Sequence, residues 1–201
     1  MEAPFDDKLE ALLDKIRLLE FELEQELQKK QKQFLYEVKR KRVRFRKEIA
    51  EQHRRLVQKF WRYWHEAAWG NILTAPVIWS CLFPALFMDA VVSFYQAVCF
   101  PVYGIPKVRR SDYIVIDRGY LKYLNSVERI NCMYCGYFNG LLAFVREVAA
   151  RTEQYWCPIK HARKVKAIHS RYKFFLDYGD AEGYRKRLEK IRRDFEDLAA
   201  G

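Results

Sequence analysis

The chain has 201 residues, enough for one ordinary domain with an extension or for two small units. Its formal net charge of +11 indicates an anionic partner, either lipid headgroups or nucleic acid. The N-terminus is acidic and has no basic region before an apolar core, so we expect no cleaved secretory signal. Five cysteines, an odd number, disfavour a disulfide framework and favour a reducing compartment with a metal or redox site.

The first third of the sequence predicts one long charged helix over residues 6–65, because no Pro or Gly lies between Pro4 and Gly70. Apolar residues in alternating steps of three and four predict a coiled-coil seam and a homo-oligomer formed through it: Leu9, Leu12, Ile16, Leu19 and Leu23. Packing of this helix on the rest of the chain is the alternative. The later part is basic, "VKRKRVRFRK", but no nucleic-acid-binding fold signature accompanies it, so nucleic acid is the less favoured partner.

An apolar segment follows, "ILTAPVIWSCLFPALFMDAVVSFYQAVCFPVYGI", in which Asp89 is the only charged residue. It is longer than the about 20 residues that a membrane-spanning helix needs. We expect a membrane-inserted hairpin that bends at residues 84–89, since both flanks are basic and Asp89 would cost about 3 kcal/mol at the middle of a crossing. A single tilted crossing and a buried core of two soluble helices are the alternatives. Aromatic residues that favour the headgroup layer precede the segment: Trp61, Tyr63, Trp64 and Trp69.

Three cysteines and a histidine form the strongest chemical pattern in the chain. Cys132 and Cys135 make a CxxC pair, and Cys157 and His161 make a CxxxH pair that shares one helix face if residues 157–161 are helical. A helix between the pairs could return the chain so that all four side chains converge. We therefore predict a tetrahedral Cys3His site for zinc, with an iron–sulfur cluster as the alternative metal group. A redox dithiol and buried structural cysteines are further alternatives.

Carboxylates near this pattern could take part in chemistry. Glu147 and Glu153 could orient His161 or act as a general base beside a metal. The ordinary alternative is an ion pair between Glu147 and Arg151, four residues apart on a helix. There is no nucleophile elbow and no phosphate-binding glycine loop, so the sequence identifies no small-molecule substrate and leaves enzymatic activity open.

The runs "NCMYCGYFNG" and "RTEQYWCPIKHA", with "FPVYGIPKVRRSDYIVIDR" upstream, resemble a family of uncharacterised bacterial proteins. The resemblance covers about half the chain, from Phe87 to Asp180. It implies a bacterial source and an apolar module joined to a cysteine module, and it implies no activity.

These observations predict a mostly α-helical protein in three parts. Residues 1–66 form a long charged, coiled-coil-like helix, residues 67–106 an apolar membrane-inserted hairpin, and residues 107–201 a small cytoplasmic helical domain with the Cys/His metal site. We expect a structural or interaction role at the anionic surface of the bacterial inner membrane. The alternatives are a membrane-bound metalloenzyme or iron–sulfur electron carrier, and a nucleic-acid binder that uses the basic helix.

Overall fold

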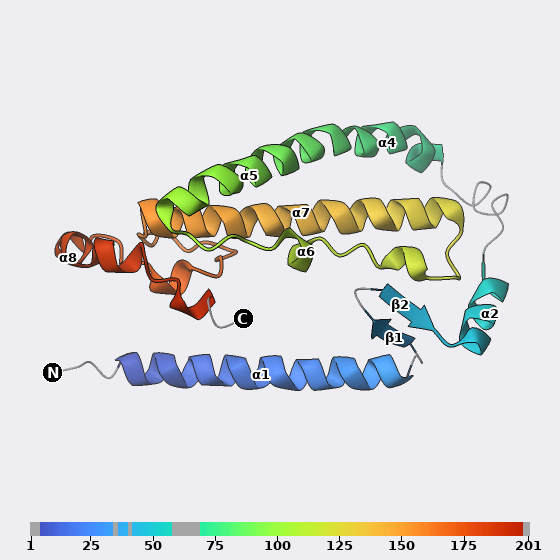
Figure 1. The fold of residues 1–201 in the computed structure, drawn as a ribbon, viewed down its shortest axis with the longest axis horizontal. Helices are drawn as coiled ribbons and strands as arrows, with labels where there is room; N and C mark the ends of the chain where they lie inside the picture. The colour runs from blue at the N-terminus through green and yellow to red at the C-terminus, as the bar shows by residue number, and fades with distance from the viewer. Residues whose placement is uncertain (1–4, 34–35, 40–41, 58–68, 199–201) are drawn as a thin grey trace.

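A computed structural model describes residues 5–33, 36–39, 42–57 and 69–198, and it confirms a mostly helical protein. Helix α7 is the central rod, with the bent rod of α4 and α5 along one side (Figure 1). The elements in chain order are α1 (Phe5–Gln33), β1 (Tyr36–Lys39), β2 (Arg42–Phe45), α2 (Lys47–Arg55), α4 (Trp69–Ser80), α5 (Leu82–Tyr103), α6 (Arg110–Tyr113), η1 (Arg118–Tyr120), α7 (Ser126–Trp156), η2 (Tyr172–Phe174), α8 (Ala181–Ile191) and η3 (Glu196–Leu198).

Helix α7 begins at a complete capping box. The Asn125 side chain accepts a hydrogen bond from the Glu128 N–H at 2.9 Å, and the Glu128 carboxylate accepts one from the Asn125 N–H at 2.8 Å. From there the helix continues without a break for 31 residues. Its buried apolar face meets α5 and the C-terminal segment in one core, made of Ala85, Phe100, Ile105, Val108, Leu141, Phe144, Val148 and Phe195.

The apolar segment forms two consecutive helices that run in the same direction, not the predicted hairpin. Figure 1 shows α4 and α5 as one bent rod whose junction is Cys81. Pro84 does not reverse the chain because it lies in the first turn of α5. Backbone N–H groups in a first turn have no acceptor within the helix, so the N–H that proline lacks is not needed there. The rod ends at Gly104, which takes the left-handed conformation (φ 69°) typical of a residue that terminates a helix.

Residues 104–125, here called the strap, return the chain along α7 to the start of that helix (Figure 1). The strap is extended except for the short helices α6 and η1. It lies against α7 so closely at Gly140 that an added Cβ would be 2.6 Å from the Tyr113 carbonyl oxygen. A small residue on α7 therefore sets the path of the strap.

The prediction of one helix over residues 6–65 is wrong beyond Gln33. An antiparallel hairpin follows, with Tyr36 opposite Phe45 and Val38 opposite Val43, and then the short helix α2. The sequences "YEVK" and "RVRF" alternate apolar and charged residues, which is the period of a strand, and β-branched and aromatic residues favour strands. Residues 58–65, the last part of the predicted helix, lie outside the described residues.

The C-terminal segment is attached to α7 through a buried arginine. Arg171 is 1% exposed; it donates to the Gln154 side chain, to the Asp194 carbonyl oxygen at 2.9 Å and to the Asp197 carboxylate at 2.7 Å. Its guanidinium also lies over the Phe195 ring. Since each of its partners is polar or aromatic, the charge is accommodated inside the protein.

Candidate membrane-binding face

The side of the α4–α5 rod that points away from α7 is apolar and exposed. Within the described residues, one stretch, Leu73–Tyr103, is long and apolar enough to cross a membrane. A core helix of a soluble protein can have the same composition, but its side chains would be mostly buried. Here the large apolar side chains along one face are 47 to 81% exposed; we call them the outer face: Leu73, Val77, Phe83, Phe87, Val91, Phe94, Val98 and Val102.

Asp89, the one charge of the apolar segment, points the other way. Two nitrogens of Arg110 on the strap donate to its carboxylate, Nη2 to Oδ2 at 2.5 Å and Nε to Oδ1 at 3.0 Å. The Tyr137 hydroxyl of α7 donates to Oδ2 at 2.9 Å, and the Ser93 hydroxyl to Oδ1 at 3.3 Å. The side chain is only 12% exposed, so the charge is neutralised inside the protein and the outer face carries none.

Other polar side chains of α5 also form hydrogen bonds to the strap and to α7. The Gln96 side chain accepts from the Val108 N–H at 3.0 Å and donates to the Val108 carbonyl oxygen at 3.3 Å. The Tyr95 and Thr152 hydroxyls are 3.1 Å apart. These bonds satisfy the polar atoms on the inner side of the rod, and they fix which side of it faces outward.

Aromatic rings stand at both ends of the rod. Trp69, the first residue of α4, is 86% exposed. At the far end, Tyr103 stacks on Tyr155 and contacts Trp156 edge to face, with ring centroids 5.0 and 5.4 Å apart. Rings with a polar tip favour the boundary between hydrocarbon and headgroups. Trp61, Tyr63 and Trp64, predicted for the same layer, lie outside the described residues.

The structure does not bring the four predicted metal ligands together. Cys132 and Cys135 lie near the start of α7, and Cys157 is the capping residue at its opposite end. At a rise of 1.5 Å per residue, the 25 residues from Cys132 to Cys157 correspond to about 37 Å. The part of the chain that the structure describes has no group of three or more His, Cys, Asp or Glu that could hold a metal. The predicted return of the chain is absent because α7 is continuous.

The CxxxH pair does not form a helical turn either. Residues 157–161 follow the end of α7, and Ile159 forms a β-bridge with Leu176. The His161 ring is stacked on the Tyr172 ring. Desolvation, with a smaller contribution from the Glu153 carboxylate, raises the pKa of the Cys157 thiol.

The two candidate carboxylates are held in structural contacts. Glu147 forms a buried ion pair with Arg151 at 2.9 Å and accepts a hydrogen bond from the Ser170 hydroxyl at 2.6 Å. The ordinary alternative for Glu147 is therefore the one that the structure shows. Glu153 lies 3.1 Å from the His169 imidazole, whose pKa is lowered by burial despite that carboxylate.

A cavity of about 450 Å³ lies between the β-hairpin and α2 on one side and the strap on the other. Its most distinctive group is His53, whose ring meets Phe45 and Tyr123 edge to face and whose buried Nδ1 has no hydrogen-bond partner among the described residues. This cavity could not be predicted from the sequence, because its walls come from segments more than 60 residues apart. Its lining comprises Val43, Phe45, His53, Asp117, Arg118, Leu121 and Tyr123.

Sequence reasoning also missed the pair of Asp89 and Arg110, although both residues stood out, one as a lone charge in an apolar segment and the other in its basic flank. The resemblance to a bacterial family stays a prediction. No protein-family model matches the chain, and no curated protein and no solved structure is significantly similar to it.

Proposed function

We propose that this chain is a membrane-associated interaction protein that binds a lipid bilayer through the outer face of α4 and α5. The observation that carries the proposal is that the polar side chains of α5 face the rest of the protein while the opposite side of the rod is apolar. Asp89 and Gln96 bond to the strap and Asp89 also bonds to α7, while the outer face is exposed and uncharged. In water such a face would be costly, at about 25 cal/mol for each Å² of exposed apolar area.

We infer that the rod lies in the plane of the membrane and does not cross it. Lys107 and Arg109 of the strap are exposed, and the strap bonds α5 at Asp89, in the middle of Leu73–Tyr103, and at Gln96, about two turns further on. In an upright crossing these charges would lie at hydrocarbon depth, at a cost of about 3 kcal/mol each. The rod is also about 46 Å long at 1.5 Å per residue, against about 30 Å of hydrocarbon. In-plane binding, with the outer face in the lipid, avoids both problems.

The proposal includes an anionic lipid surface as the partner. A basic loop follows α7 at the end where Trp156 contacts Tyr103 of α5, so its charges lie near the same end of the rod. Three of the four charged residues are exposed, and Lys160 is half-buried beside Asp177: Lys160, Arg163, Lys164 and Lys166. Each Lys or Arg near an anionic bilayer contributes about 1 kcal/mol. We place the protein at the bacterial inner membrane with its other parts in the cytoplasm.

Vesicle flotation of the full chain tests the lipid partner. The double variant Phe87→Glu/Phe94→Glu puts two carboxylates on the outer face, and we expect its partitioning into phosphatidylcholine–phosphatidylglycerol vesicles to fall at least about 100-fold. The matched control, Leu18→Glu/Phe21→Glu, adds the same charge on α1, where both side chains are also exposed. Circular dichroism verifies folding. Equal flotation of the wild type and the outer-face variant would refute lipid binding by this face.

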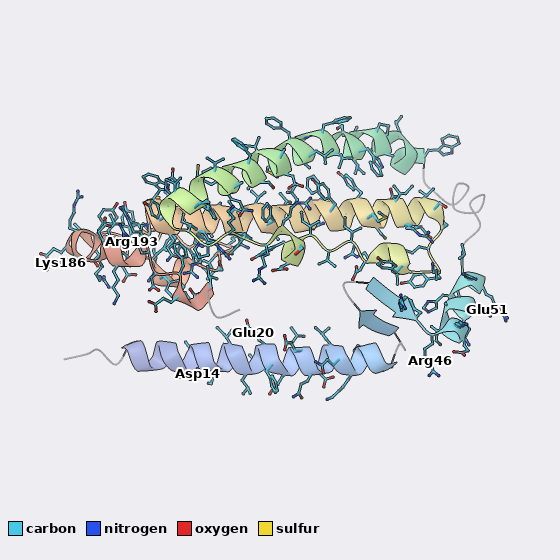
Figure 2. The ribbon with its side chains drawn as sticks, in the orientation of Figure 1. Asp14, Glu20, Arg46, Glu51, Lys186 and Arg193 are labelled. Carbon is cyan, nitrogen blue, oxygen red and sulfur yellow. The ribbon has the colours of Figure 1, made fainter. Side chains whose placement is uncertain are left out.

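The in-plane orientation has its own test. Glu51 on α2 and Lys186 on α8 are exposed at opposite ends of the molecule (Figure 2). Glu51→Cys and Lys186→Cys, each in a chain whose native cysteines are serine, are reconstituted in sealed vesicles and treated with a membrane-impermeant maleimide. We expect both sites to react from the same side of the membrane. Reaction from opposite sides would establish a crossing and refute the in-plane orientation.

A further inference from the structure

Helix α1 presents an apolar seam that nothing in the described chain covers. The side chains of α1, Asp14 and Glu20 among them, project from a helix that stands apart from the body (Figure 2). Every described side chain of α1 is exposed. The seam residues among them are 49 to 62% exposed: Leu12, Ile16, Leu19 and Leu23.

The spacing of the seam fixes a heptad register. With Leu9, Ile16 and Leu23 at positions a, Leu12 and Leu19 fall at positions d, and an apolar residue occupies each of these five positions. Ile16 is the one β-branched residue among these a positions, and a β-branched residue at a with leucine at d favours a two-stranded parallel coiled coil. The seam ends at Glu26, a position d where the carboxylate is instead 2.6 Å from Lys29.

The charges beside the seam are complementary to a second copy of the same helix. In this register Lys15 is at position g and Glu20 at position e, five residues later. In a parallel, in-register dimer, g of one helix faces the e five residues on in the other, so Lys15 of each copy faces Glu20 of its partner, twice by symmetry. In an antiparallel arrangement with position 12 opposite position 23, Lys15 faces Glu22 at another g position and Glu20 faces Leu13, so only the parallel form brings Lys15 and Glu20 together.

We propose that the partner of α1 is a second copy of this chain, and that two α1 helices form a parallel, in-register coiled coil through Leu9 to Leu23. The two-fold arrangement buries the same seam on both copies. The dimer is independent of lipid binding, because the seam and the outer face lie on different helices. On a membrane it would give each assembly two lipid-binding faces and so raise its avidity.

Disulfide trapping distinguishes the arrangements. Leu12→Cys and Leu23→Cys are made separately in a full chain without native cysteines, purified in mild detergent and oxidised. A parallel, in-register dimer cross-links each variant with itself. An antiparallel dimer cross-links only the mixture of the two variants, because position 12 then faces position 23. Cross-links in the mixture alone, or no cross-links, would overturn the proposal.

Charge exchange in the chain with its native cysteines provides the second test, measured by sedimentation equilibrium. Lys15→Glu alone places carboxylates opposite Glu20, and we expect the dimer dissociation constant to rise roughly tenfold, with recovery in Lys15→Glu/Glu20→Lys. Leu19→Glu/Leu23→Glu should abolish the dimer. Leu18→Glu/Phe21→Glu, at positions c and f on the far side of α1, is the matched control and should remain dimeric. Equal loss in both double variants, or no rescue by charge exchange, would contradict the seam. Vesicle flotation is a separate readout, so failure of the dimer leaves lipid binding testable.

Discussion

Asp89 on α5 and Arg110 on the strap form an ion pair in which two guanidinium nitrogens donate to one carboxylate, at 2.5 and 3.0 Å. The carboxylate side is enclosed, at 12% exposure, and the arginine side is half exposed. Because Tyr137 of α7 donates to the same carboxylate, three segments of the chain meet at this group. The pair holds the strap to the rod and keeps the one charged residue of positions 72–105 away from the outer face.

Loss of both members of this pair should cost less than the sum of the two single losses. Arg110→Met leaves an enclosed carboxylate without its counterion, and we expect the free energy of unfolding to fall by about 3 kcal/mol. Asp89→Asn should cost about 1–3 kcal/mol, and the double variant should lose less than the two changes summed. Denaturant unfolding in detergent measures the cycle. Arg109→Met, an exposed neighbour, is the control and should change little. Additive losses in the cycle would show that the pair is not coupled.

The sequence predicted the helical class and the position of the apolar segment, because composition and hydrophobic length are local properties. It did not predict the course of the chain at residues 84–89, where Pro84 and Asp89 resemble a turn. A turn is not needed to expose the Asp89 carboxylate, because Arg110, 21 residues later, neutralises it inside the protein. The β-hairpin was missed for a different reason: no Gly or Pro marks it, and only the alternation of Val38, Val43 and Phe45 with charged residues does.

The predicted metal site depended on a helix that returns the chain, and the sequence contains the evidence against it. "NSVE" at residues 125–128 is a capping-box pattern that starts a helix just before Cys132, and no Pro follows until Pro158. A helix of that length separates its ends whatever the chemistry of the residues there. The contacts of Glu147 could be anticipated only as far as Arg151, because Ser170 reaches it through tertiary structure.

The close approach of the strap to α7 predicts a sharp difference between two glycines. In Gly140→Ala the new Cβ would meet the Tyr113 carbonyl oxygen at 2.6 Å and the Ile114 Cα at 2.8 Å, so the backbone must move. We expect a loss of about 1–3 kcal/mol in the free energy of unfolding. In Gly136→Ala the nearest atom is 3.4 Å away, and better helix propensity should leave stability equal or higher. Thermal melting compares the two. Equal effects would contradict the described path of the strap.

The half-buried imidazole of His169 should make stability fall in mild acid. Burial lowers its pKa in the folded state below the ordinary value of 6.5, more than the nearby Glu153 and Glu147 carboxylates raise it, and the Arg146 charge acts in the same direction as burial. Stability from the neutral form is therefore complete above pH 6.5. It declines as the pH falls towards the folded-state pKa, by at most about 1.4 kcal/mol per pH unit, because only the unfolded chain takes up the proton.

Melting at pH 7.5 and pH 5.5 measures this dependence. His169→Gln should reduce the difference between the two melting temperatures, whereas His161→Gln, at an exposed histidine, should leave it in place. An unchanged difference in His169→Gln would assign the acid sensitivity to other groups.

The separation of the cysteines predicts that the protein is stable without a metal shared among them. If the predicted Cys3His site held a structural ion, Cys132→Ser or Cys157→Ser would unfold the C-terminal part. With the two residues about 37 Å apart along α7, we expect each substitution to change the free energy of unfolding by less than about 1 kcal/mol. Melting before and after dialysis against a strong chelator, with metal analysis of both samples, tests this. The contrary result would be that dialysis removes one bound zinc per chain from the wild type and lowers its melting temperature strongly, with neither effect in the two variants. The ligands would then have to come from different chains. The sedimentation measurements on α1 would then determine whether the same dimer supplies them.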